Sequence, residues 1–153
     1  MISFVLITAE EHILLNIGGI QQKDGWINVN AQPQGGVIVH MVTENGSFNG
    51  AYKGHTDVLN NMDNLIAFKN DSVSVVYASH VLEHASHKDT HKILLEWRRV
   101  LHTGGAVLIS VPDLEVLFET FLTPKWKPYR AQLVVNIFGA HTDEFDYHKS
   151  GFR

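Results

Sequence analysis

The sequence predicts an α/β fold with a doubly wound, mostly parallel sheet and helices on both faces. Apolar runs of strand length recur without polar alternation, as in residues 73–78 and 106–111, and such runs form strands that are covered on both sides. These runs alternate with segments of helical spacing, as in residues 89–101, which is typical of βαβ units. A chain of 153 residues fits one domain, so we expect a single domain over residues 1–153.

The strands are expected near residues 13–17, 26–30, 37–42, 73–78 and 106–111. Gly18 and Gly19 follow the first of these runs, and Pro112 follows the last. Glycine and proline interrupt regular structure, so they set the strand ends. Residues 55–59 show no clear strand pattern and are assigned to a loop or a helical stretch.

Three helices are expected, over residues 89–101, 114–122 and 130–138. In the first, an apolar stripe recurs at helical spacing, formed by Ile93, Leu94, Trp97, Val100 and Leu101. Asp89 and Asp113 precede or open the first two helices, and Asp is a favoured N-cap residue.

Composition excludes several classes of protein. The chain has no cysteine, which rules out disulfides, a thiolate zinc site and a cysteine nucleophile. Its net charge of −4 comes without any block of like charges, which argues against binding to nucleic acid or to an acidic membrane surface. The apolar run at residues 2–9 is too short to span a bilayer. A cytoplasmic location and a small-molecule substrate are therefore expected.

In doubly wound sheets, ligands bind beyond the carboxyl ends of the strands. Several polar or glycine residues lie where the expected strands end. They are Asn16, Gly18 and Gly19 in the first loop, Asn30 in the second, Asp57 in the 55–59 stretch, and Ser79, His80, Glu83 and His84 after residue 78. A bare glycine backbone allows close approach of a ligand.

The order and spacing of these motifs resemble a known family. The quoted segments are LNIGG at 15–19, GWINVN at 25–30, SVVYASHVLEH at 74–84, LEWRRVLHTGG at 95–105 and DYHKSGF at 146–152. Together they are similar to class I S-adenosylmethionine-dependent methyltransferases, in particular the small bacterial type 11-like proteins. The resemblance runs from about Leu14 to Pro112 and more weakly to Phe152.

The resemblance implies a Rossmann-like fold that binds S-adenosylmethionine and methylates a small acceptor. It places Asn16, Gly18 and Gly19 beside the methionine part of the cofactor, Asn30 at the ribose, Asp57 at the adenine, and Ser79 and His80 beneath the sulfonium. A general base is needed only when the acceptor must lose a proton. His80, Glu83 and His84 are the catalytic candidates for that role, with help from Asp113 or His148.

Three departures from the family pattern favour an alternative. Ile20 stands where the family has a further glycine, and Asn30 stands where it has an acidic residue. The chain also ends at Arg153, before the last strands of the family, so a homodimer that covers the exposed sheet edge is expected. The alternative function is a methyltransferase-like relic that acts as a non-catalytic binding module. If the ribose assignment holds, Asn30→Asp is expected to tighten cofactor binding.

The histidines provide a third, weaker hypothesis. His80, Glu83 and His84 match H-x-x-E-H, a zinc signature of certain peptidases. His80, His84, His87 and His91 would also share one face of a continuous helix. However, the β-branched run before His80 places that residue at a strand end, whereas the peptidases carry the motif in a helix. A zinc hydrolase is therefore the least favoured hypothesis, and no metal ligands are assigned.

Overall fold

The computed structural model describes residues 12–19, 25–31, 39–40 and 56–153. The described residues form two compact units: those of the first lie within 1–79 and 91–109, and those of the second within 80–90 and 110–153. Each unit is described by itself. The expectation of one domain over residues 1–153 stays a prediction.

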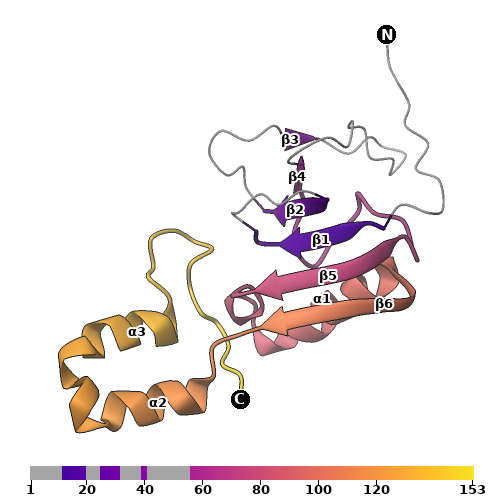
Figure 1. The fold of residues 1–153 in the computed structure, drawn as a ribbon. Coiled ribbons are helices and arrows are strands. Elements are labelled where there is room, and N and C mark those ends of the chain that lie inside the picture. The colour runs from indigo at the N-terminus through magenta and orange to yellow at the C-terminus, as the bar shows by residue number, and fades with distance from the viewer. Residues whose placement is uncertain (1–11, 20–24, 32–38, 41–55) are drawn as a thin grey trace. The chain divides into compact units, whose positions relative to one another are not determined.

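The first unit holds a sheet whose described strands are ordered β3-β4-β2-β1-β5-β6 (Figure 1). The strands are β1 (Leu14–Ile17), β2 (Trp26–Asn30), β3 (Val39–His40), β4 (Thr56–Leu59), β5 (Val73–Ser79) and β6 (Leu101–Ser110). The pairs β1–β2, β1–β5, β2–β4 and β3–β4 are all parallel. The predicted α/β class with a mostly parallel, Rossmann-like sheet is confirmed.

Two strand predictions need correction. Residues 56–59 are strand β4, which pairs with β2 inside the sheet; the assignment of 55–59 to a loop or helix was wrong because so short a stretch shows no alternation of its own. Strand β6 begins at Leu101, earlier than the predicted residue 106. The preceding helix ends at Val100, whose carbonyl accepts from the Ser72 amide at 2.8 Å.

The strand order contains a reversal beside β1. From β1 the chain adds β2 and then β4 on one side, and it returns to place β5 on the other side of β1. The register pairs Ile17 at the end of β1 with Ala78 near the end of β5. The carboxyl ends of these two strands are thus neighbours at a topological switch point, where doubly wound sheets bind ligands.

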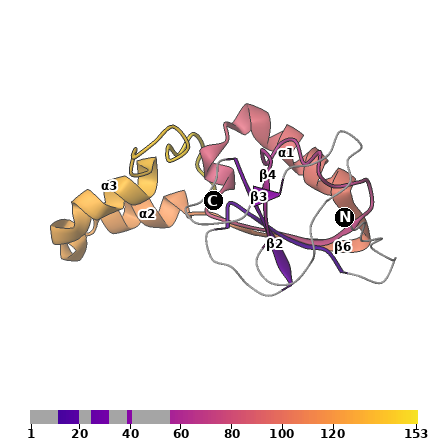
Figure 2. The same ribbon diagram turned by 90° about the horizontal axis from the view of Figure 1, so that it is seen from above.

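Buried apolar side chains of the strands and of α1 (His87–Val100) form the core of this unit. The part of α1 in the first unit lies along one face of the sheet (Figure 2). It buries Ile93, Trp97 and Val100 almost completely, which confirms these positions of the predicted stripe, whereas Leu94 is exposed. Burial of each such side chain stabilises the fold by about 1.5–3 kcal/mol.

The start of α1 corrects the predicted cap. The helix begins at His87, and the Ser86 hydroxyl oxygen accepts from the Asp89 amide at 3.2 Å. Ser86 is thus the capping residue, and Asp89 lies in the first turn. The two residues form a reciprocal pair, because the Ser86 hydroxyl also donates to the Asp89 carboxylate.

The second unit contains η1 (Leu82–His84), α2 (Leu114–Leu122), η2 (Pro124–Tyr129) and α3 (Arg130–Phe138). The helices predicted at 114–122 and 130–138 are confirmed. Asp113 caps α2 as expected, since its carboxylate accepts from the Val116 amide at 3.0 Å. Among the described residues, no helix combines the length and the apolar character needed to cross a membrane.

Candidate functional site

The loop after β1 turns sharply at Gly18. Its φ is 68°, a left-handed conformation that favours glycine. The Gly18 amide donates to the Val29 carbonyl at 2.8 Å, which ties the turn to β2. Gly18 is exposed, so its backbone is open to a ligand at the end of β1.

Asparagine amides hold this glycine turn from two strands. Asn16 Nδ2 donates to Asn28 Oδ1 at 2.9 Å, and Asn30 Nδ2 donates to the Gly19 carbonyl at 3.0 Å. A Cβ on Gly19 would overlap the Asn16 side chain, so the close packing requires glycine there. Sequence reasoning missed Asn28, although two asparagines in the otherwise apolar strand 26–30 were a signal.

The other cofactor candidates lie on neighbouring strands. Ser79 is the last residue of β5 and is half-buried. Asp57 lies in β4, where its register partner in β2 is Asn28. The structure therefore brings Asn16, Gly18, Gly19 and Asn30 together and places Asp57 on the strand beyond β2. Ile20, the departure from the glycine pattern, lies outside the described residues.

His80 opens the second unit with φ of 55°, an uncommon left-handed conformation for a non-glycine residue. Its Nδ1 lies 3.3 Å from Glu83 Oε1. Leu82–His84 is a short 3-10 helix, and α1 begins only at His87. The four histidines therefore do not share one continuous helix, because the left-handed residue and the break before α1 separate them; this corrects the helical alignment.

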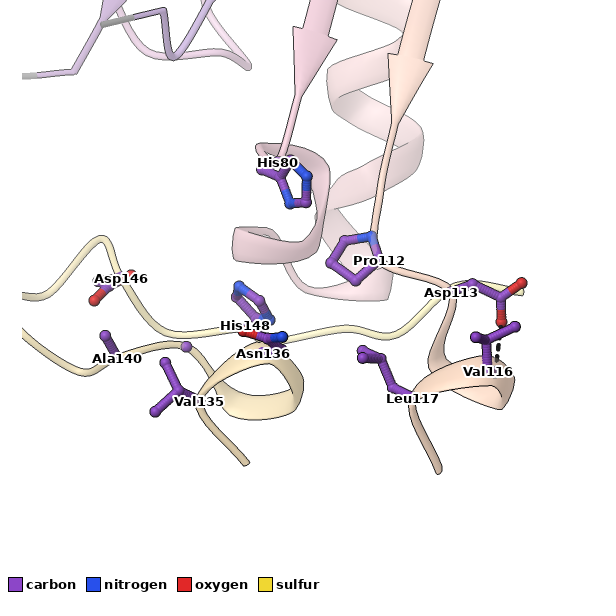
Figure 3. A pocket seen from close by; sticks show the side chains of 11 residues that line it. His80, Pro112, Asp113, Val116, Leu117, Val135, Asn136, Ala140, Asp146 and His148 are labelled. Carbon is purple, nitrogen blue, oxygen red and sulfur yellow. Dashed lines mark hydrogen bonds between the residues drawn. The ribbon is translucent and has the colours of Figure 1, made fainter. Parts of the chain in front are cut away.

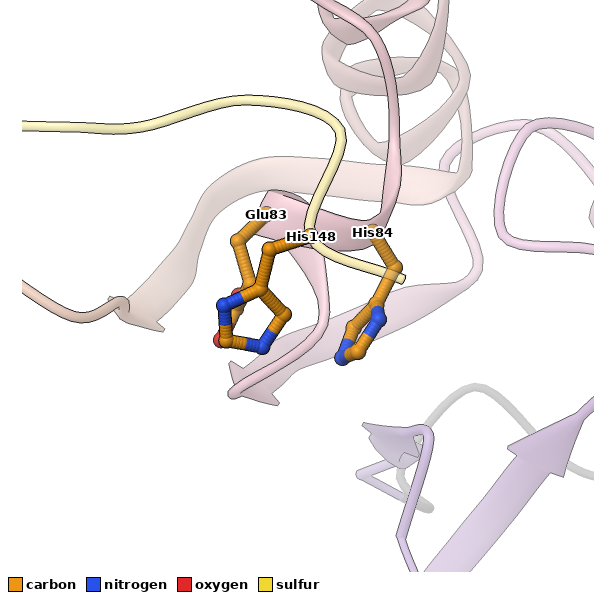
Figure 4. A group of neighbouring side chains, drawn as sticks. All are labelled: Glu83, His84 and His148. Atoms are coloured by element: carbon orange, nitrogen blue, oxygen red, sulfur yellow. The ribbon is translucent and has the colours of Figure 1, made fainter. Parts of the chain in front are cut away.

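The side chains of Glu83 and His84 extend from η1 next to that of His148 from the C-terminal segment (Figure 4). One ligand atom of each residue lies within 4.8 Å of the others. The His84 and His148 rings meet edge to face, with 4.9 Å between centroids. Two backbone bonds fix this contact: the amides of Lys149 and Ser150 donate to the Glu83 carbonyl at 2.7 and 3.1 Å.

A pocket of about 450 Å³ lies in the same unit, between α2, α3 and the C-terminal segment (Figure 3). Its polar lining residues are His80, Asp113, Asn136, Asp146 and His148, and its apolar ones include Pro112, Val116, Leu117 and Val135. Of the three catalytic candidates, His80 lines this pocket, whereas Glu83 and His84 do not.

The carboxylate of Asp146 is held in its charged form at the rim of this pocket. The backbone amide and then the hydroxyl of Thr142 donate to it, and these bonds lower the pKa of Asp146. Sequence reasoning missed Asp146 and Asn136 as lining residues. The quoted segment 146–152 was a signal for Asp146, whereas nothing in the helical pattern of 130–138 pointed to Asn136.

Comparison with known families bears on this geometry. The family model described as Methyltransferase domain matches residues 38–109. These residues, a little under half of the chain, are similar to that domain. This finding confirms the resemblance stated from the sequence motifs. The comparison with curated proteins found no match, and the comparison with solved structures found none either.

Only some of the candidate site residues lie within the part of the chain that matches the family model. Asp57, Ser79, His80, Glu83 and His84 fall inside residues 38–109. The glycine turn and its asparagines at residues 16–30, and His148, fall outside the matched part. The structure nevertheless pairs β1, which leads into the turn, with β5, which lies in the matched part. The sheet therefore links the turn to the part of the chain that matches the family model.

Proposed function

We propose that this chain is an S-adenosylmethionine-dependent methyltransferase that acts on a small-molecule acceptor. The observation that carries the proposal is the pairing of β1 with β5, which sets the glycine turn beside the carboxyl end of β5 at the switch point. A nucleoside cofactor binds at this point in doubly wound sheets. The match to the methyltransferase domain supports the same function.

The residues at the sheet end fit such a cofactor. Gly18 offers an exposed backbone without a side chain, and Gly19 is packed so closely that the turn keeps its shape. We assign Asn16, Gly18 and Gly19 to the methionine part, with Asp57 toward the adenine and Ser79 toward the sulfonium. The cofactor, when bound, supplies an electrophilic methyl group. The chain's own residues serve mainly to position the reactants.

Asn30 fits the ribose in a different way from the acidic residue of the family. Its Nδ2 is engaged with the Gly19 carbonyl, so its Oδ1 is the atom that would accept from a ribose hydroxyl. A neutral amide forms a weaker bond than a carboxylate there. The assignment therefore predicts modest cofactor affinity.

We assign the acceptor to the pocket of the second unit. Its volume of about 450 Å³ lies in the range that small-molecule sites occupy, and its apolar walls with a few polar groups are typical of them. His80 is the candidate base, because it lines this pocket and directly follows β5 in the chain. Glu83 is almost fully buried and is not assigned this role.

Calorimetric titration with S-adenosylhomocysteine tests the cofactor site. We expect binding to the unaltered chain and affinity at least about tenfold weaker for Gly18→Ala, because a Cβ would strain the turn and narrow the approach. Gly104→Ala is the matched control: Gly104 also has positive φ, at 87°, and open space around it. It should lose comparable stability and keep its affinity for S-adenosylhomocysteine.

One observation favours the relic as a second candidate. The Asn30 amide is used to hold the turn, and it stands where the family has an acidic residue. A chain that shows no binding in the titration while remaining folded would support this non-catalytic binding module. The zinc hydrolase is not proposed, because η1 is too short to carry its helical motif.

A further inference from the structure

We propose that Glu83, His84 and His148 of the second unit bind a divalent transition metal ion such as Zn²⁺ (Figure 4). The site would fasten the C-terminal segment to η1 through side chains in addition to the backbone. This inference is independent of the proposed methyl transfer, since a metal can bind here whether or not the chain binds the cofactor.

The first support is the burial of the Glu83 carboxylate without hydrogen bonds. Its side chain is 1% exposed, and neither carboxylate oxygen has a hydrogen-bond partner among the described residues. His80 Nδ1 lies 3.3 Å from Oε1, which is an ion pair only when the two-thirds exposed ring is protonated, and the two atoms form no hydrogen bond. A buried carboxylate without hydrogen bonds is strongly unfavourable. A cation beside it would supply the missing interaction.

The second support is the tautomer of each histidine. His84 Nδ1 lies 3.3 Å from the Tyr147 carbonyl oxygen, and His148 Nδ1 lies 3.2 Å from the Ile137 carbonyl oxygen. A carbonyl oxygen only accepts, so both Nδ1 atoms carry hydrogen and donate. In a neutral ring the lone pair is then on Nε2. Ligating histidines commonly have this arrangement, with the second nitrogen fixed by a backbone carbonyl.

The third support is that the backbone already holds the ligands together. Lys149 and Ser150, which follow His148, both donate to the Glu83 carbonyl. The three ligand atoms lie within 4.8 Å of one another, while bonds of about 2.0–2.1 Å in a tetrahedral site place ligand atoms roughly 3.3 Å apart. The ligand atoms would have to approach one another by up to about 1.5 Å. Rotation of the three side chains can supply such a shift without refolding of the backbone.

The donor set selects the class of metal. Two imidazoles and one carboxylate suit zinc and its neighbours among the first-row divalent ions better than magnesium or calcium, which prefer oxygen ligands. Three protein ligands leave a fourth position for water or another donor, as in open zinc sites. His148 also lines the pocket, so a metal held by this residue would lie next to the pocket.

Metal titration of the full chain tests the proposal. After treatment with a chelator, Zn²⁺ is added in a calorimeter, and Co²⁺ is added separately while its visible absorption is recorded. We expect one tight equivalent of Zn²⁺, a Co²⁺ spectrum typical of tetrahedral coordination, and higher thermal stability with metal. His148→Ala should weaken Zn²⁺ binding at least about tenfold, because one of three ligands is lost.

The variant Glu83→Gln separates ligation from a merely structural role. It keeps the shape of the side chain and removes the buried charge. We expect the metal-free variant to be at least as stable as the unaltered chain, and its Zn²⁺ affinity to fall at least about tenfold. A loss of stability without metal and unchanged Zn²⁺ affinity would overturn the proposal, because the carboxylate would then be paired by protonated histidines.

His91→Ala is the matched control. His91 is exposed on α1, four residues after His87, and such a pair can bind zinc on a helix surface. We expect the His91→Ala variant still to bind one equivalent of Zn²⁺ tightly. If His91→Ala removes it while His148→Ala does not, or if the unaltered chain binds no tight equivalent, the assignment to Glu83, His84 and His148 is wrong.

Discussion

The hydrogen bond of the buried Asn30 amide restricts which residue types fit at the carboxyl end of β2. Its side chain is 6% exposed, and its Nδ2 donates to the Gly19 carbonyl at 3.0 Å. An aspartate has no hydrogen to donate, so a carboxylate at this position would face a carbonyl oxygen. The residue that the family uses to bind ribose is therefore incompatible with this particular hydrogen bond.

Asn30→Asp is accordingly predicted to destabilise the chain, by about 1–3 kcal/mol, since it leaves a buried acceptor without its donor. Affinity for S-adenosylhomocysteine should fall, because the glycine turn loses its support. This reverses the direction expected from the sequence. Urea denaturation and calorimetric titration measure the two effects.

Asn70→Asp is the control for that experiment. The Asn70 side chain uses its oxygen, which accepts from Arg99 Nη1 at 2.7 Å, and a carboxylate can accept in the same way. We expect a change in stability within about 0.5 kcal/mol. Tighter cofactor binding by Asn30→Asp, without loss of stability, would show that the ribose contact outweighs the bond to Gly19.

At the scale of elements, the two members of an ion pair within α1, Glu96 and Arg99, form hydrogen bonds to the segment at residues 65–70. Glu96 Oε1 accepts from the Leu65 amide and from Arg99 Nη2, both at 2.7 Å. Arg99 donates in turn to the Phe68 and Leu65 carbonyls at 3.0 and 3.1 Å. The pair therefore satisfies backbone groups of a segment that has no regular structure of its own.

This pair predicts how stability depends on pH. The hydrogen bond from Arg99 is the largest cause that lowers the pKa of Glu96 below 4.5, and burial opposes it in part. Because the folded chain binds this proton less tightly than the unfolded chain, the stabilisation is present above about pH 4.5 and is lost as pH falls through the lowered value.

Glu96→Gln should therefore be less stable than the unaltered chain at pH 7, by about 2 kcal/mol, the size of a charged hydrogen bond. The difference should narrow as pH falls through the lowered pKa of Glu96, where its carboxylate becomes protonated. Urea denaturation at several pH values between about 7 and 3 measures it. A difference that stays constant over this range would show that the pair contributes packing alone.

Individual elements also show what sequence reasoning could and could not supply. The helices at 114–122 and 130–138 were predicted with their observed bounds, because their apolar spacing and the Asp113 cap are local signals. Strand β4 was not, since pairing with β2 and β3 defines it. The pattern at 74–84 led to His80, Glu83 and His84, but the approach of Glu83 and His84 to His148 depends on how the distant 146–152 segment folds.

At the scale of the whole molecule, β6 is the last strand of the described sheet. Its side chains Val107, Leu108 and Ile109 are 38–52% exposed. An edge strand that exposes apolar side chains and unpaired backbone groups favours association with another chain. We therefore propose that two copies of this chain associate through β6, which retains the expectation of a homodimer.

Leu108→Lys is predicted to weaken this association, because a charge on an edge strand opposes pairing. Sedimentation equilibrium over a range of concentrations should show dimers for the unaltered chain and at least about tenfold weaker association for the variant, since burying an unpaired charge is costly. Leu122→Lys is the control: Leu122 lies on α2 and is 71% exposed, so this variant should dimerise normally. If the unaltered chain stays monomeric at high concentration, or if the two variants weaken association equally, β6 is not the interface.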